Sequence, residues 1–209
     1  MSKSLLVDYI PFEVTREQIN ESISDNNGRL VVKGVLQRAE AKNQNGRVYP
    51  RDTLMREAAK YAKVQIKERR ALGELDHPDS SVVNLNNVSH NVLEMHWKGD
   101  DLVGTVEVLG TPAGNILKEL FKSGIKLGIS SRGLGSVEEM NEGDGHDAVV
   151  KVQPDFELIA FDFVSNPSTH GAFLSPTNEG KLNEGVGTRN GKCCHDCKIE
   201  DIINDIFRG

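Results

Sequence analysis

Gly128-Ile129-Ser130-Ser131-Arg132-Gly133 is the stretch from which the rest of the chain is best understood. It places two serines between glycines, inside a run from Ile125 to Val137 whose composition predicts a β-strand. A nucleophilic serine needs a stiff element to present its hydroxyl, and glycine lets a substrate backbone approach closely. The stretch therefore favours a strand that carries a nucleophile, although such patterns more often mark a bend with solvated hydroxyls.

Two other short stretches supply partners for such a serine. Gly73-Glu74-Leu75-Asp76-His77-Pro78 offers His77 as a general base, and Phe161-Asp162-Phe163-Val164 offers Asp162 as a carboxylate that orients it. Glu157 is the alternative carboxylate. The order of these residues along the chain is unimportant, because a catalytic triad is defined by geometry. Three further histidines are rivals of His77 as the base: His90, His96 and His170.

Composition narrows the classes of protein to consider. The 209 residues suffice for one domain with a core, and the formal net charge of -6 argues against a general nucleic-acid binder. The chain has no apolar run of 18 residues and no signal-peptide layout at its start, so we expect no membrane partner and a cytosolic compartment. Cys193, Cys194, His195 and Cys197 lie too close together to surround one tetrahedral ion, so we expect no metal site and no cofactor.

The hydrophobic pattern predicts an α+β domain of mostly antiparallel, hairpin-connected strands with two helices between them. Six or more such strands are expected to curl into a barrel-like arrangement that hides their edges. The domain is predicted over residues 29–176, after a leader (1–28) and before a flexible tail (177–209), and both tails are expected to be disordered. The predicted strands are 30–36, 86–97, 101–109, 125–137, 147–152 and 156–164. The predicted helices are 52–69 and 111–124.

Three motifs together resemble a known family. They are Asn45-Gly46-Arg47-Val48-Tyr49-Pro50, the His77 stretch, and the serine stretch extended to Ser136. Over about residues 29–176 the chain resembles the prohead core protein proteases of T-even-type tailed phages, distant relatives of the herpesvirus assemblin proteases. The resemblance implies a serine endopeptidase with a herpesvirus-protease-like fold. It would act inside the assembling prohead in the host cytoplasm, with scaffold and core proteins and the major capsid protein as substrates.

The resemblance also assigns roles to individual residues. The family's catalytic histidine falls on His77, its nucleophile on Ser130 and its third member on Asp162. Ser131 is expected on the opposite face of the strand, since side chains alternate along a strand. Ser131 and Arg132, with nearby backbone N–H groups, are secondary candidates for supporting the oxyanion, and for Arg132 a structural salt bridge is the favoured role.

Proteases of this family favour cleavage after glutamate when isoleucine or leucine lies two residues before it. Ile19-Asn20-Glu21, followed by Ser22, and Leu182-Asn183-Glu184, followed by Gly185, match this pattern just outside the predicted domain. We therefore expect the enzyme to trim both of its own ends. Arg47 and Lys126 are candidate donors to the glutamate carboxylate.

Other functions remain as alternatives. A non-catalytic scaffold or core component of the prohead would keep the same fold, although no member of the proposed triad is missing. An esterase of the α/β-hydrolase type is disfavoured because the chain has no Gly-x-Ser-x-Gly elbow. A metalloprotease is disfavoured because there is no His-Glu-x-x-His motif. The sequence leaves a homo-oligomer open.

Overall fold

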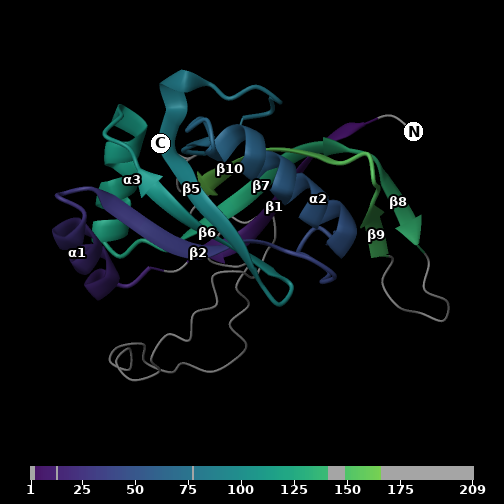
Figure 1. Cartoon of the computed structure of the whole chain (residues 1–209), viewed down its shortest axis with the longest axis horizontal. Helices are drawn as coiled ribbons and strands as arrows, with labels where there is room; N and C mark the ends of the chain where they lie inside the picture. Colours follow the sequence, from purple (N-terminus) through teal and green to yellow (C-terminus); the bar gives the residue numbers. More distant parts are fainter. Residues whose placement is uncertain (1–2, 13, 77, 141–148, 166–209) are drawn as a thin grey trace, which may run out of the picture. The chain divides into compact units, whose positions relative to one another are not determined.

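Two antiparallel sheets and three α-helices form the core of the computed structural model, which describes residues 3–12, 14–76, 78–140 and 149–165 (Figure 1). The first sheet has the strand order β1 (Ser4–Phe12), β7 (Leu127–Gly135), β10 (Glu157–Val164). The second has the order β2 (Leu30–Arg38), β6 (Asp101–Val108), β5 (Val88–Lys98), β4 (Leu72–Glu74).

A smaller sheet and the helices complete the described structure. The small sheet has the order β3 (Arg47–Val48), β9 (Val149–Val152), β8 (Val137–Met140). The helices are α1 (Arg16–Asp25), α2 (Arg51–Tyr61) and α3 (Pro112–Lys122), with a π-helical turn at Ala62–Ile66 and a 3₁₀ turn at Leu85–Asn87.

The core lies between the two larger sheets, and Phe163 of β10 is near its centre. The ring of Phe163 meets those of Phe12 and Phe121 edge to face, at centroid distances of 5.2 and 5.4 Å. Such pairs add to the free energy gained by burying the rings. Strands β1 and β10 and helix α3 are thus held together by one aromatic cluster.

The sheets approach each other at both edges. Leu75, just after β4, forms a parallel bridge with Phe163 of β10. At the other edge, a Cβ at Gly34 of β2 would lie 2.4 Å from the ring of Phe12 of β1, so the two strands are in close contact there. The α+β, mostly antiparallel fold predicted from the sequence is confirmed, and its sheets curl toward one another.

The expectation of an irregular leader over residues 1–28 is wrong for most of that segment. β1 pairs with β7 over nine residues, from Ser4 opposite Gly135 to Phe12 opposite Leu127. Helix α1 begins with a capping box at Thr15 and buries Ile19 in the core. The domain therefore includes the N-terminal segment, while the predicted tail at 177–209 lies outside the described residues.

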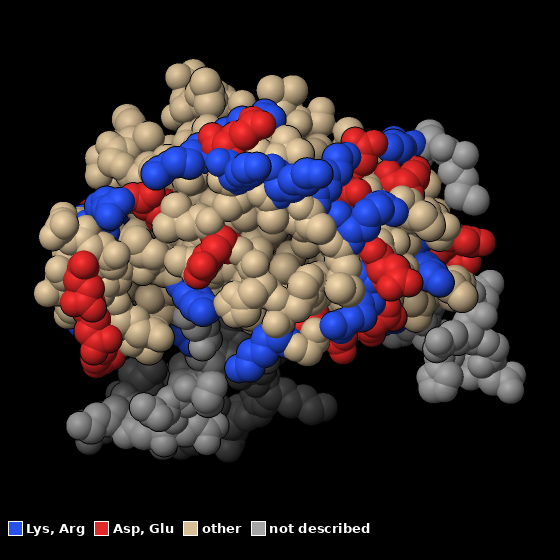
Figure 2. All heavy atoms as spheres, viewed as in Figure 1, with Lys and Arg blue, Asp and Glu red and all other residues tan. Residues whose placement is uncertain are grey.

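Basic and acidic side chains are mixed over the face of the molecule shown in Figure 2, in keeping with a formal net charge of -6. Among the described residues, no helix is both long and apolar enough to cross a membrane.

The packing of α1 predicts unequal effects of two Ile→Ala substitutions. Ile19 is 1% exposed, whereas Ile116 on α3 is 55% exposed. Ile19→Ala should lower the free energy of unfolding by about 2–4 kcal/mol, because it removes buried methyl groups and leaves a cavity. Ile116→Ala should change it by less than about 0.5 kcal/mol. Denaturant unfolding of both variants checks this, and equal effects would show that α1 does not pack on the domain.

Candidate active site

Ser130 lies on the central strand of the first sheet, between two neighbours that face it directly. Its register partners are Tyr9 on β1 and Asp162 on β10. Directly opposed residues of antiparallel strands project from the same face, with Cβ atoms about 5 Å apart. Ser130 is 1% exposed, and its Oγ has no hydrogen-bond partner among the described residues. The sheet therefore brings the predicted nucleophile and the predicted carboxylate side by side.

The glycine before this serine has a structural explanation. A Cβ at Gly128 would lie 1.4 Å from the ring of Tyr9, which packs over the strand at this point. The glycine therefore makes room for a side chain of β1, and not for a substrate backbone as predicted from the sequence.

Asp162 is fully buried and held by a cation and a backbone amide. Its Oδ2 lies 2.9 Å from Nε of Arg132, and its Oδ1 accepts hydrogen bonds from Nη2 of Arg132 at 3.1 Å and from the amide of Glu74 at 3.0 Å. Burial outweighs these contacts and raises the pKa of Asp162 to about 6. Each carboxylate oxygen can accept two hydrogen bonds, so Asp162 retains capacity for a further donor.

The alternative carboxylate, Glu157, lies elsewhere. It is opposite Leu134, four residues along β7 from Ser130, which corresponds to about 13 Å along a strand. Its side chain is 52% exposed and pairs with Lys3 at 2.6 Å. The geometry therefore favours Asp162 over Glu157 as the partner of Ser130.

Arg132 is not available as an oxyanion donor. It is fully buried, and each of its three side-chain nitrogens lies within 3.1 Å of an acceptor on Asp162, Glu74 or Ser80. The structural salt bridge, which the sequence favoured for Arg132, is the arrangement observed. The N–H groups of β7 are directed toward β1 and β10, as in any central strand, so they offer no obvious oxyanion site either.

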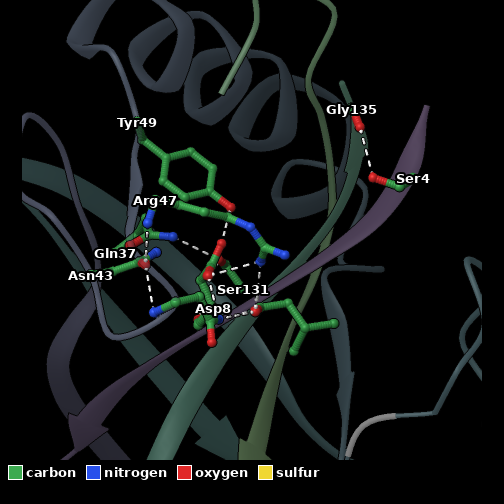
Figure 3. A network of polar contacts seen from close by, with 10 residues as sticks. Ser4, Asp8, Gln37, Asn43, Arg47, Tyr49, Ser131 and Gly135 are labelled. Atoms are coloured by element: carbon green, nitrogen blue, oxygen red, sulfur yellow. Dashed lines mark hydrogen bonds and ion pairs between the residues drawn. The ribbon is translucent and has the colours of Figure 1, made fainter. Parts of the chain in front are cut away.

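Ser131 points to the other face of β7, as alternation along the strand predicted. Its Oγ accepts a hydrogen bond from Nε2 of Gln37 at 2.7 Å and lies 3.5 Å from the carbonyl oxygen of Asp8 (Figure 3). Ser131 is 1% exposed and lies on the face of the sheet that packs against the core. It cannot support an oxyanion formed at Ser130, and it fixes β7 against β1 and β2 instead.

The Asn45-to-Pro50 motif completes this support (Figure 3). The buried carboxylate of Asp8 accepts hydrogen bonds from Asn45 at 2.7 Å, from Arg47 at 3.1 Å and from the hydroxyl of Tyr49. Burial, together with the charge of Asp8, raises the pKa of Tyr49 well above its usual value, so this hydroxyl stays a donor. Arg47, a sequence candidate for binding a substrate glutamate, is engaged in a structural pair, while Lys126 is exposed just before β7.

The predicted base, His77, lies outside the described residues, but the chain before it is well placed. The amide of Asp76 donates to the carbonyl of Phe163 at 2.8 Å, one residue from Asp162. Of the rivals, His96 is exposed on β5 and His170 lies outside the described residues. His90 is fully buried between Ser89 and the carbonyl of Phe161, and burial lowers its pKa to about 4.

Of the two predicted self-cleavage sites, one lies within the described residues and the other lies outside them. Glu184 and Gly185 lie outside the described residues. The Glu21–Ser22 bond lies within α1, and the Ser22 hydroxyl bonds both the carbonyl and the amide of Val31. Cleavage there requires α1 to open first, because a protease binds its substrate in an extended form.

Sequence reasoning missed Glu74 and Asp8 as parts of this region. Both are acidic residues within apolar stretches, Leu72-Gly73-Glu74-Leu75 and Leu6-Val7-Asp8-Tyr9, and both are buried. A carboxylate inside an apolar strand is the signal that could have identified them, because a buried charge needs a partner.

The Asp8 network predicts different outcomes for two Tyr→Phe substitutions. Tyr49→Phe removes a donor to a buried carboxylate and should lower the free energy of unfolding by about 1.5–3 kcal/mol. Tyr61 is equally buried, but its hydroxyl has no partner within the described part of the chain, so Tyr61→Phe should be neutral within about 0.5 kcal/mol. Denaturant unfolding measures both, and a neutral Tyr49→Phe would contradict the network.

Comparison with known proteins identifies the family. The family model described as "Prohead core protein serine protease" matches residues 6–184. The prohead core protein protease of enterobacteria phage T4 is 33% identical over 150 residues, which cover 70% of this chain and 68% of that protein. The solved structure of the bacteriophage T4 capsid assembly protease, gp21, has 28% identity and a TM-score of 0.64, and the match covers 78% of this chain and 99% of that one. This chain therefore belongs to the prohead core protein serine protease family.

Proposed function

We propose that this protein is a serine endopeptidase that processes scaffold and capsid proteins, including the major capsid protein, and itself during phage prohead maturation. It would act inside the assembling prohead in the host cytoplasm. The observation that carries the proposal is the pairing of Ser130 with Asp162 on adjacent strands, with the hydroxyl unpartnered within the described residues. Family membership supports the same conclusion.

The proposed mechanism assigns one step to each residue. The Ser130 hydroxyl attacks the scissile carbonyl while His77 takes its proton, and His77 then returns that proton to the leaving amine. Asp162 accepts a hydrogen bond from the imidazole, which fixes its tautomer and stabilises its cation. His77 then takes a proton from a water molecule, which attacks the acyl-enzyme. The ester bond to Ser130 breaks, Ser130 regains its proton from His77, and the new carboxyl end is released.

The proposed specificity is cleavage after glutamate in Ile/Leu-x-Glu sequences. Within this chain the sites would be Glu21–Ser22 and Glu184–Gly185. The non-catalytic scaffold component with the same fold is the second candidate. The presence of serine and aspartate at facing positions favours the enzyme.

Ser130→Ala and Ser131→Ala separate these possibilities. With a peptide copied from residues 178–190, Ser130→Ala should lower kcat/KM by about 10⁴-fold or more, because it removes the nucleophile. Ser131→Ala removes the hydrogen bonds of this hydroxyl with Gln37 and Asp8 on the core side and should change kcat/KM less than about 10-fold. Mass spectrometry of the products measures the cleavage rate of both variants.

Full activity of Ser130→Ala would exclude the proposed nucleophile. Absence of cleavage by the unaltered protein within assembled proheads would favour the scaffold alternative.

Self-cleavage after Glu21 should depend on the stability of α1. Thr15→Ala removes the side-chain cap on the amide of Gln18 and should open the helix more often, so cleavage after Glu21 should rise about fivefold. The sequence of the site itself is unchanged. Thr111→Ala, which removes the corresponding cap of α3, is the matched control and should leave this rate unchanged. Equal acceleration by both variants would mean that cleavage follows global unfolding.

A further inference from the structure

Three fully buried charged side chains from three strands meet beside Ser130. Glu74 comes from β4, Arg132 from β7 and Asp162 from β10, and each is 0% exposed. Nη2 of Arg132 lies 2.9 Å from Oε1 of Glu74 and 3.1 Å from Oδ1 of Asp162. One guanidinium thus serves two carboxylates, and the remaining oxygen of Glu74 has no partner among the described residues.

Such a cluster is costly to bury. Ionised groups lose their hydration, and packed apolar side chains at the same positions often give an equally stable fold. The other face of β7 also has a buried carboxylate, Asp8, but three donors converge on that single charge, whereas here two carboxylates share one guanidinium. The location of these charges, next to Ser130, therefore points to a role beyond holding the sheets together.

The cluster also holds the segment that follows β4. Nη1 of Arg132 donates to the carbonyl of Ser80 at 2.8 Å, and Oε1 of Glu74 accepts from the amide of Asn84 at 3.0 Å. At the start of the segment, the amide of Asp76 donates to the carbonyl of Phe163. Ser80 is thus attached to the nucleophile strand by Arg132, Asn84 to β4 by Glu74, and Asp76 to β10 by its own backbone.

We propose that Glu74 and Arg132 are positioning residues of the protease: Arg132 orients the Asp162 carboxylate toward the Ser130 face, and Glu74 fixes Arg132 and the segment 78–84. This inference rests on the proposed function, since it concerns the same site. Neither residue touches substrate in this account, and each acts through a group that it holds.

The cluster gives the two residues opposite electrostatic effects on Asp162. Arg132 on β7 lowers the pKa of Asp162, whereas the negative charge of Glu74 on β4 raises it. Burial, and to a lesser degree the charge of Asp162, raises the pKa of Tyr61 on α2, so Tyr61 is a neutral group. His90 on β5 bonds the carbonyl of Phe161 and is neutral above about pH 4.

The test compares Glu74→Gln and Arg132→Lys with Glu57→Gln in the full-length chain. Glu57 is a matched control, because it is also buried and bonds the amide of Leu158 on β10, at the end of the strand away from Asp162. For each variant, kcat, KM and the pH profile of kcat/KM are measured on the peptide from residues 178–190, with Ser130→Ala as the inactive reference.

We expect Arg132→Lys to lower kcat about 10- to 100-fold with little change in KM, because an ammonium group cannot hold the carboxylate at two points. Glu74→Gln should move the acid limb of the kcat/KM profile to lower pH by about one unit, since it removes a negative charge that disfavours ionisation of Asp162. Glu57→Gln should leave both the profile and kcat unchanged.

The possible failures are distinguishable. If the unaltered protein does not cleave, or if Ser130→Ala cleaves equally well, the proposed function fails. If Ser130 is required but Glu74→Gln and Arg132→Lys behave like Glu57→Gln, the positioning role is wrong. If these two variants fail to fold where Glu57→Gln folds, as judged by circular dichroism, the cluster is structural and the inference is overturned.

Discussion

The pairing of β7 on both of its edges is the constraint on which this structure depends. Eight of its nine residues are buried, and it pairs with β1 along its whole length and with β10 along most of it. Because side chains alternate along a strand, this one element places Ser130 beside Asp162 on one face and Ser131 against Gln37 on the other. A strand fixed on both edges is also a rigid support for a nucleophile, which must be held close to its productive position.

Each face of β7 carries a buried polar network, and the two differ in what they can do. On the Ser131 face, one carboxylate is surrounded by three donors from the Asn45-to-Pro50 motif, so the charge of Asp8 is well satisfied. On the Ser130 face, two carboxylates share one guanidinium, and the pKa of Asp162 is raised to about 6. A satisfied network stabilises a fold, whereas an under-neutralised carboxylate beside a hydroxyl can still accept a hydrogen bond from a base. Both depend on residues far apart in sequence, so the site forms only when the sheets have assembled.

The sequence predicted the fold well where an element is determined by its own local residues. The β5–β6 hairpin and helix α3 followed from alternation, a turn, and the cap formed by Thr111 and Pro112. It failed for β1 and α1, because the apolar run of β1 is interrupted by Asp8 and Pro11 and α1 buries only Ile19. Asp8 is tolerated in a strand because its partners arrive from about 40 residues away, and Pro11 because β1 is an edge strand. No local pattern shows such partners.

The candidate site divides in the same way. Ser130 and Asp162 could be proposed from motifs, but their adjacency depends on the β7–β10 register, which a sequence does not contain. The engagement of Arg132 and the contribution of Glu74 likewise required three strands to be placed together. His77 remains a prediction from sequence, supported by the position of Asp76 beside Phe163.

Covalent labelling with diisopropyl fluorophosphate, followed by peptide mapping, determines whether Ser130 is an activated nucleophile. The reagent phosphorylates a serine only when a neighbouring base makes its hydroxyl nucleophilic. We expect a single modified residue, Ser130, and loss of the adduct in His77→Ala. Modification of Ser131 or of another serine, or no modification in protein taken from active proheads, would contradict it.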